Sequence, residues 1–274
     1  MVILTRMRKW LYILLAFLPV LSCVGQKDDP VEPDPDPDPI PEEPGGGSDE
    51  GKDFYRRSLV LDFTGTWCVN CPKMEAAIEE TMEDRPGRVV PVSVHCMMVD
   101  PMYVKPLCDD LVKQFSVSAY PSAVVDLDPE SLISTSSPEL LMAQLDRLLE
   151  ARGPAAGLCA ETALSGDAFT VKAEMKAVRE GTYTLAVLLV EDGIVKAQTG
   201  GSADHVHNNV LRSWTEGEAR SLQEGEALTL ELEGTLAGSS RFVILALRDG
   251  LVDNVAACAA GTTLDYQYEE EVTE

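Results

Sequence analysis

The sequence predicts an α/β domain over residues 52–152, followed by an all-β sandwich over residues 153–268. Up to about residue 152, short apolar segments typical of strands alternate with segments that have the periodicity of an amphipathic helix, as an α/β sheet requires. A Gly- and Pro-rich break then covers residues 152–157, and beyond it apolar and polar residues alternate with a period of two. This change of period predicts two different folds along the chain.

The composition predicts a sizeable core and a strongly acidic surface. Of the 274 residues, 45% are hydrophobic, which excludes a globally disordered chain. The 46 acidic residues outnumber the 22 basic ones, and the formal net charge is −24. Because such a surface repels phosphate backbones, we expect no nucleic-acid partner.

The first 22 residues have the features of a secretory signal peptide. Three basic residues, Arg6, Arg8 and Lys9, precede an apolar run over residues 10–21 that is too short to span a bilayer comfortably. The run ends in Val-Leu-Ser-Cys, with the cysteine at Cys23, and this resembles the lipobox of bacterial lipoproteins. We therefore expect a lipid on Cys23 that anchors the protein in a membrane. A single-pass anchor, or a signal cut elsewhere, is the alternative.

Residues 23–51 are predicted to form an acidic tether rich in Pro, Asp and Gly. Proline favours an extended chain and like charges repel, so the tether should be a semi-stiff spacer. Near its start Lys27 is followed by two acidic residues, which resembles the surface-export signal of Bacteroidetes lipoproteins. The sequence thus predicts an outer-membrane lipoprotein, either exposed at the cell surface or facing the periplasm. Residues 269–274 are predicted to form a short acidic tail.

A CxxC motif follows the first predicted strand. Residues 58–63 form an apolar stretch, a tight turn comes next, and the helix-period stretch 73–83 begins directly after Pro72. This order places Cys68 and Cys71 at a helix N-terminus, where the helix dipole and unpaired N–H groups stabilise a thiolate. We expect Cys68 to be the exposed attacking sulfur and Cys71 the shielded sulfur that completes the reaction.

Three further features distinguish this motif from a zinc site, which uses the same spacing but needs a second pair of ligands. Trp67 directly precedes the first cysteine, Asp62 lies on the preceding strand, and Tyr120-Pro121 precedes another apolar strand. Together these features resemble thioredoxins. The resemblance implies that Asp62 handles protons for the second cysteine, and that a cis Tyr120–Pro121 bond docks a substrate peptide. Burial on its strand should raise the pKa of Asp62.

The remaining elements of the first domain alternate as the fold class requires. Strands are predicted over residues 88–94 and 131–135, and helices over residues 103–115 and 139–152. The last of these is amphipathic, with its leucines on one face.

The side chains of His95, Cys96 and Cys108, with nearby methionines, have three interpretations. Cys96 ends a strand and Cys108 lies on the next helix, so they are candidates for a local disulfide in an exported protein. The same residues also form a set of soft ligands that would suit copper. The interpretation we favour is that they are buried residues of a strand end and of the core.

Alternation with a period of two predicts the strands of the second domain. Residues 169–176 alternate, while residues 183–190 and 242–247 are apolar on both faces, as central strands are. Short strands with Gly-rich turns favour a β-sandwich. Its two cysteines, Cys159 and Cys258, lie near its ends and are predicted to form a disulfide. In the chain-entropy model such a cross-link adds roughly 4–5 kcal/mol.

The segment 204–212 contains the side chains of this second domain that look most functional. His205 and His207 have the spacing of a metal-binding pair, but no third ligand lies nearby in the sequence. We therefore expect both histidines to make ordinary loop hydrogen bonds. No metal or cofactor is predicted for the protein.

Several short motifs occur in one order along the chain. They are Phe63-Thr64-Gly65, the CxxC with Pro72, His95, Tyr120-Pro121, Val190-Glu191-Asp192-Gly193-Ile194-Val195, Gln198 and His207-Asn208-Asn209-Val210-Leu211-Arg212. This set resembles the Bacteroidetes family of 28-kDa-type outer-membrane lipoproteins, which joins a thioredoxin-like domain to a C-terminal β-sandwich. The resemblance implies location and architecture more than a reaction. The dipeptide Val69-Asn70 departs from well-studied oxidoreductases, because it lacks the histidine of strong oxidants.

The sequence as a whole predicts a membrane-anchored, exported thiol–disulfide oxidoreductase. Cys68 attacks, Cys71 completes the exchange, Asp62 assists proton transfer, and Tyr120 with Pro121 docks the substrate. The expected partners are thiols or disulfides of exported proteins, together with an electron donor that the sequence does not identify. The alternative is a surface lipoprotein that binds a peptide or a glycan, with a structural disulfide at the CxxC; a copper-binding protein ranks behind both.

Overall fold

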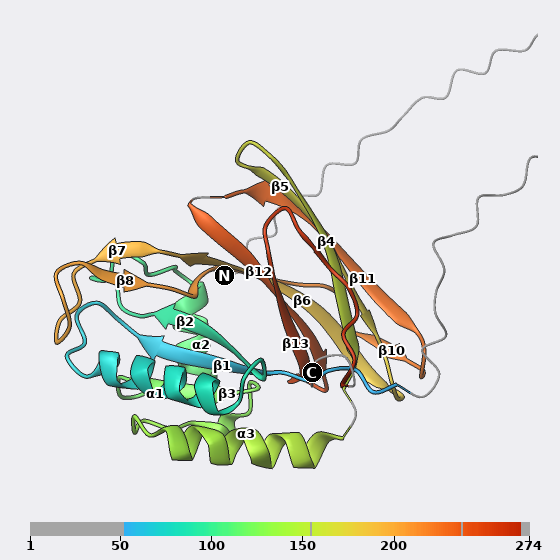
Figure 1. Ribbon diagram of the computed structural model, residues 1–274, viewed down its shortest axis with the longest axis horizontal. Helices are drawn as coiled ribbons and strands as arrows, with labels where there is room; N and C mark the ends of the chain where they lie inside the picture. The colour runs from blue at the N-terminus through green and yellow to red at the C-terminus, as the bar shows by residue number, and fades with distance from the viewer. Residues whose placement is uncertain (1–51, 154, 237, 270–274) are drawn as a thin grey trace, which may run out of the picture. The chain divides into compact units, whose positions relative to one another are not determined.

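A computed structural model of the chain describes residues 52–153, 155–236 and 238–269 (Figure 1). The predicted signal peptide, Cys23 and the tether lie outside the described residues, as do residues 270–274 of the acidic tail. The described residues group into one compact unit. None of the described helices is long and apolar enough to cross a membrane.

The part of the chain up to Arg152 alternates strands with helices. Its elements are β1 (Ser58–Thr64), α1 (Cys71–Asp84), β2 (Val89–His95), α2 (Leu107–Gln114), β3 (Ser122–Val125), the 3-10 turn η1 (Pro129–Ser131) and α3 (Pro138–Arg152). All seven residues of β1 are buried, as expected of a central strand. β2 pairs with β1 in parallel and β3 pairs with it antiparallel.

Two elements of this part differ from the sequence prediction. The strand expected over residues 131–135 is replaced by η1 and a single bridge between Ala123 and Ile133. The hydroxyl of Ser131 accepts from the N–H of Val125 and donates to the carbonyl of Asp128, and such side-chain bonds compete with strand pairing. The second helix begins only at Leu107, directly after a proline that lacks the N–H a helix interior needs.

Beyond α3 the described chain consists of strands. They are β4 (Gly157–Ser165), β5 (Ala168–Lys176), β6 (Gly181–Asp192), β7 (Ile194–Lys196), β8 (His205–His207), β9 (Val210–Glu216), β10 (Arg220–Leu222), β11 (Ala227–Thr235), β12 (Ser239–Arg248), β13 (Leu251–Ala259) and β14 (Thr263–Leu264). Four of them form one sheet in the order β11-β5-β4-β14, and β7 and β8 form a separate hairpin.

The predicted fold class, an α/β thioredoxin-like domain followed by an all-β sandwich, is wrong. The described residues form fourteen strands and only three α-helices, so the protein is mostly β. One mixed sheet of eight strands, ordered β13-β12-β6-β9-β2-β1-β3 with β10 beside β6, takes strands from both predicted folds. At the junction β9 pairs with β2 in parallel, and the N–H of Ser93 donates to the carbonyl of Asn209 at 2.8 Å. β9 therefore covers the edge of β2 that two separate folds would leave unpaired.

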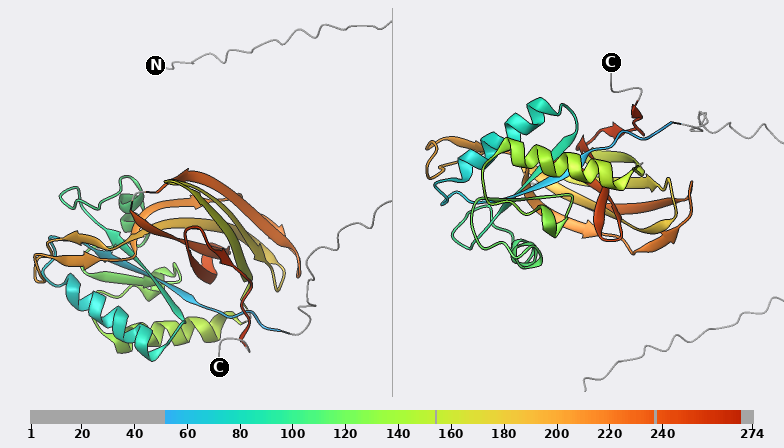
Figure 2. Two further views of the ribbon diagram at one scale, coloured as in Figure 1. Left: turned by 45° about the horizontal axis from the view of Figure 1, so that its top comes forward. Right: turned by 90° about the horizontal axis from the view of Figure 1, so that it is seen from below.

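Different layers cover the faces of the large sheet (Figures 1 and 2). α1 and α3 lie side by side on one face of β1, β2 and β3, and they share an apolar cluster with these strands. α2 packs into a second cluster that runs along the sheet from β1 to β13. β4 and β5 cover β6, β12 and β13 with a third cluster. On β6, Leu185 and Val187 point into the third cluster and Ala186 and Leu188 into the second, which confirms a strand buried on both faces.

The predicted disulfide between Cys159 and Cys258 does not form in this structure, where both residues are free thiols. The pleat of β4 gives the reason. Leu158 and Ala160 point into the same apolar cluster as Cys258, so Cys159 between them points to the outer face of the sheet. There its thiol bonds to the side chain of Tyr266. Sequence separation alone did not reveal that the two cysteines face opposite ways.

Candidate functional site

A disulfide joins Cys68 and Cys71 at the N-terminus of α1. The turn before it closes through a 3.0 Å bond from the N–H of Cys68 to the carbonyl of Gly65, and Pro72 occupies the first turn of the helix. Both cysteines are buried, with exposed fractions of 5% and 2%. The expectation of an exposed Cys68 is therefore wrong for this disulfide form of the protein.

The segment that follows β7 covers the CxxC turn. The side-chain amide of Gln198 donates to the carbonyls of Gly65, at 3.2 Å, and Cys68, at 2.9 Å. The N–H of Thr199 donates to the carbonyl of Thr66 at 2.8 Å. These bonds come from a part of the chain about 130 residues away in sequence, and they explain why Cys68 is buried.

Trp67, which directly precedes Cys68, packs against Tyr120. Their rings meet edge to face at 5.2 Å, and the indole N–H of Trp67 donates to the carbonyl of Cys96 at 2.9 Å. The peptide bond between Tyr120 and Pro121 is cis. The structure thus brings Trp67, Tyr120 and Pro121 together near the CxxC turn.

Asp62 lies on β1 and lines the same cavity as Cys71. It is 4% exposed, and its Oδ1 has no hydrogen-bond partner among the described residues. Burial, assisted by the charge of Glu75, raises the pKa of Asp62 to about 8. The expected rise in this pKa is therefore confirmed.

The cavity beside Cys71 is small and lined by polar groups. Its volume is about 20 Å³, enough for about one water molecule. Side chains from β1, α1, β2 and β8 meet there, including Asp62, Cys71, Glu75, His95 and His207. A proton that leaves Cys71 therefore enters a space surrounded by titratable side chains.

The histidines of β8 contribute to this site, which the sequence reasoning did not anticipate. Nε2 of His205 lies 3.1 Å from Oε2 of Glu75 on α1, and the rings of His205 and His207 are 4.5 Å apart. Burial, followed by the charges of His95 and His205, lowers the pKa of His207 to about 4. The alternation of β8 did place both histidines on one face, but nothing local indicated that this face meets α1.

His95 is held by the carboxylate of Asp100, both oxygens of which accept hydrogen bonds. Asp100 accepts from Nδ1 of His95 at 3.1 Å, from the N–H of Thr66 at 2.6 Å and from the N–H of Met102 at 2.8 Å. Burial alone would raise the pKa of Asp100, but the bonds and the charge of His95 bring it below its usual value. Asp100 thereby ties the loop after β2 to the CxxC turn.

Cys96 and Cys108 are free and buried, as the favoured interpretation expected. Burial raises the pKa of the Cys96 thiol to about 12, so this thiol stays protonated and unreactive at neutral pH. Within the described ranges no group of three or more His, Cys, Asp or Glu side chains is arranged to hold a metal ion.

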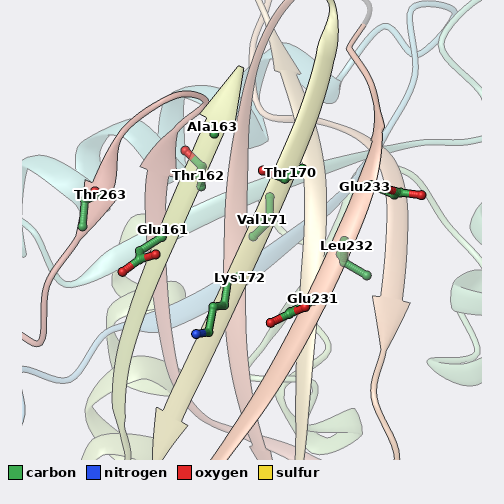
Figure 3. Close-up of a pocket in the computed structure, with 10 residues that line it drawn as sticks. All are labelled: Glu161, Thr162, Ala163, Thr170, Val171, Lys172, Glu231, Leu232, Glu233 and Thr263. Carbon is green, nitrogen blue, oxygen red and sulfur yellow. The ribbon is translucent and has the colours of Figure 1, made fainter. Parts of the chain in front are cut away.

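A larger pocket lies away from the disulfide, on the outer face of the four-stranded sheet. Its volume is about 780 Å³ (Figure 3). Lys172 of β5 stands between Glu161 of β4 and Glu231 of β11, as the strand register requires. No residue of this pocket lines the cavity beside Cys71, so the two sites are separate.

The site and the sheet together define a mostly β protein with a buried CxxC disulfide at a helix N-terminus. No family model and no curated protein matches the chain. Among solved structures the chain is similar to HBP35 of Porphyromonas gingivalis, with a TM-score of 0.64, 15% identity, and 76% of each chain covered. It is also similar to a protein of Agrobacterium tumefaciens, with a TM-score of 0.55, 13% identity, and 77% of this chain and 97% of that chain covered. At these identities the similarity shows the fold alone.

Proposed function

We propose that the protein is an exported thiol–disulfide oxidoreductase that exchanges disulfides with cysteines of other exported proteins. The observation that carries this proposal is the Cys68–Cys71 disulfide at the start of α1, next to a buried carboxyl group with a raised pKa. A helix N-terminus lowers the pKa of a thiol and so favours the thiolate that attacks disulfides. Buried carboxyl groups of this kind occur where protons are transferred.

In the reducing direction the reaction begins from the dithiol form. The thiolate of Cys68 attacks one sulfur of a substrate disulfide, an S–S bond forms between Cys68 and the substrate, and the other substrate sulfur leaves as a thiolate. Cys71 then attacks Cys68, the internal disulfide forms, and the second substrate thiolate leaves. The substrate gains two electrons, and an external dithiol returns them to the protein.

Asp62 is proposed to accept the proton of Cys71 in the second step. The thiol of Cys71 must ionise before it attacks, and burial disfavours a thiolate with no proton acceptor nearby. The cavity between the two side chains accommodates about one water molecule, which would carry the proton from sulfur to carboxylate. Asp62 acts here without touching the substrate.

A polypeptide substrate is favoured over a small thiol by the surface around the CxxC turn. Val69 lies between the two cysteines and is exposed. Met97, Met98 and Val99, in the loop after β2, are exposed as well. Trp67 and Thr66 hold this loop beside the turn through their bonds to Cys96 and Asp100, so the apolar side chains flank the disulfide. Such side chains suit contacts with apolar residues next to a substrate cysteine. Tyr120 and Pro121 are proposed to dock the backbone of the substrate polypeptide.

Location at the outer membrane is part of the proposal. The signal-like start, the lipobox ending at Cys23 and the acidic tether support a lipoprotein. The order of short motifs from Phe63 to Arg212 supports a place in the 28-kDa-type lipoprotein family of the Bacteroidetes.

The test is disulfide reduction by three cysteine variants of the protein. Cys68→Ser should lower the rate of insulin reduction at least about a hundredfold, because the attacking thiolate is lost. Cys71→Ser should accumulate a mixed disulfide between Cys68 and the substrate, which mass spectrometry detects. Cys159→Ser removes a thiol on the outer face of the distant sheet and serves as the matched control with unchanged rate.

Full activity in Cys68→Ser would refute the proposal. That result would favour the alternative, a binding protein in which the buried disulfide is structural. Resistance of the wild-type disulfide to a mild dithiol would point the same way, because structural disulfides have low reduction potentials.

A further inference from the structure

The cavity beside Cys71 contains two buried polar atoms without hydrogen-bond partners among the described residues. They are Oδ1 of Asp62 on β1 and Nε2 of His207 on β8. His207 is 5% exposed and makes a backbone hydrogen bond to Lys196. Because Nε2 is unpartnered, Nδ1 makes that bond and carries the proton, which leaves Nε2 as an acceptor. Leaving both atoms unpaired is costly, and a single water molecule would bond to both.

A second pair of side chains connects this cavity to solvent. His205 also lines the cavity, and its Nε2 lies 3.1 Å from Oε2 of Glu75. The Glu75 side chain is 36% exposed at the surface of α1. The buried end of the cavity, at Asp62 and Cys71, is thus linked to the surface by His207, His205 and Glu75.

Asp62 needs such a route. At pH 7 a carboxyl group with a pKa of about 8 is mostly protonated, so it must release its proton before it accepts that of Cys71. Its 4% exposure closes direct access to bulk water. The cavity is the space into which this proton can pass.

We propose that His207, His205 and Glu75 form a proton path that connects Asp62 and Cys71 to solvent during disulfide exchange, an inference that rests on the proposed function. In the second step the S–H bond of Cys71 breaks and the S–S bond to Cys68 forms. Before this step Asp62 passes its own proton through cavity water to Nε2 of His207, which transfers it to the His205–Glu75 pair for release to solvent. Asp62 then accepts the proton of Cys71 through cavity water. The two histidines and Glu75 are positioning and proton-transfer residues, because they do not touch the substrate.

The charged and titratable groups around this path come from every element packed against it. β1 supplies Asp62, and β8 supplies His205 and His207. The remaining groups are Glu75 and Glu79 on α1, His95 on β2 and Asp100 in the loop after β2. Because His95 donates to Asp100, it is fixed at the cavity wall, whereas His205 on β8 and Glu75 on α1 lie partly at the surface.

The test follows the attack of Cys71 directly, without an unknown substrate or electron donor. Reduced protein is mixed with dithiobis-nitrobenzoate. The reagent releases one coloured thiolate when it forms a mixed disulfide with Cys68. A second coloured thiolate is released when Cys71 attacks that mixed disulfide and the Cys68–Cys71 disulfide forms. The second phase does not depend on reagent concentration. His207→Gln keeps a polar side chain but cannot carry a proton, so it should slow this phase about tenfold at pH 6.5.

The pH profile distinguishes a proton path from a structural role. Above about pH 9 Asp62 is already ionised, so the rates of His207→Gln and wild type should converge. Near neutral pH, added imidazole should partly restore the rate of the second phase in His207→Gln. His205→Gln, at a partly exposed position, should show the same profile with a smaller loss, and it keeps the test valid if His207→Gln does not fold. Val206→Thr, exposed on the other face of β8, is the matched control.

The outcomes separate this inference from the proposed function. If wild-type protein shows no concentration-independent second phase, Cys71 does not complete the exchange and the proposed function fails. If wild type shows that phase and both histidine variants match it, or are slowed equally at every pH, the proton path is refuted while the proposed function stands.

Discussion

At the scale of single residues, Asp62 and His207 show how burial shifts two kinds of titratable group in opposite directions. Burial disfavours the charged form of each, so the pKa of the carboxyl group rises to about 8 and that of the imidazole falls to about 4. Around neutral pH both side chains are therefore mostly uncharged. Two neutral polar groups can share one small cavity without the cost of a buried ion.

The raised pKa of Asp62 makes the stability of the disulfide form depend on pH. Between about pH 4 and pH 8 the unfolded chain releases the Asp62 proton and the folded protein keeps it, so the free energy of unfolding falls as pH rises. The loss is at most about 1.4 kcal/mol per pH unit and ends above pH 8. Asp62→Asn should remove this dependence on pH, because the amide does not titrate. The free energy of unfolding of the variant should therefore rise relative to that of wild type as pH increases through this window.

Urea unfolding at a series of pH values measures this difference. His207 is present in both proteins, so the comparison isolates Asp62. Asp84→Asn, at an exposed position at the end of α1, is the control and should track wild type. A constant difference between Asp62→Asn and wild type from pH 5 to pH 8 would contradict the argument.

At the scale of elements, the segment after β7 packs closely over the CxxC turn. Gln198 and Thr199 donate three hydrogen bonds to carbonyls of the CxxC turn. Gly200 has a φ of +80°, and a Cβ atom there would overlap the carbonyl oxygen of Val69. Position 200 therefore requires glycine for two reasons: its φ is positive, and its backbone lies too close to the Val69 carbonyl to leave room for a Cβ atom.

Gly200→Ala should displace this segment from the CxxC turn. We expect the Cys68–Cys71 disulfide to be reduced several times faster by a small dithiol, and the protein to lose about 1–3 kcal/mol of stability. Gly193→Ala is the matched control, because Gly193 has a φ of +73° but no atom within 4 Å of an added Cβ. If both variants change the reduction rate equally, backbone strain accounts for the effect and the contact with Val69 does not.

At the scale of the whole molecule, residues far apart in sequence are joined by buried polar side chains. The side chain of Asn254 on β13 accepts from the N–H of Arg57 at 2.9 Å. It donates to the carbonyls of Tyr55 and Ala156, at 3.1 and 2.8 Å. One amide thus connects the chain before β1, the chain before β4, and β13.

The shared sheet predicts one cooperative unfolding transition, which calorimetry measures. Asn254→Ala leaves several buried backbone groups unpaired, at about 1–3 kcal/mol each. We therefore expect it to lower the free energy of unfolding by at least about 2 kcal/mol while the transition stays single. Gln223→Ala removes an exposed amide and should change little. Two separate transitions in wild type would show that the parts on either side of α3 unfold independently.

The local parts of the site followed from the sequence. The apolar residues of β1, the tight turn and the proline after the second cysteine fix the order of strand, CxxC and helix, because each depends on neighbours within a few residues. The position of Asp62 on a buried strand was enough to predict the direction of its pKa shift. The double-sided apolar runs likewise predicted β6 and β12 as central strands.

What the sequence by itself determined, then, is the position of most of the strands and helices and the place of the CxxC between a buried strand and a helix. The tertiary structure decided the rest: that β9 joins β2, that Gln198 covers Cys68, that His207 reaches the cavity of Asp62, and that Cys159 faces away from Cys258. The physical reason is that periodicity identifies the buried face of a strand but carries no information about its partner. Pairing between strands is a long-range choice, made by the whole sheet as it closes its exposed edges.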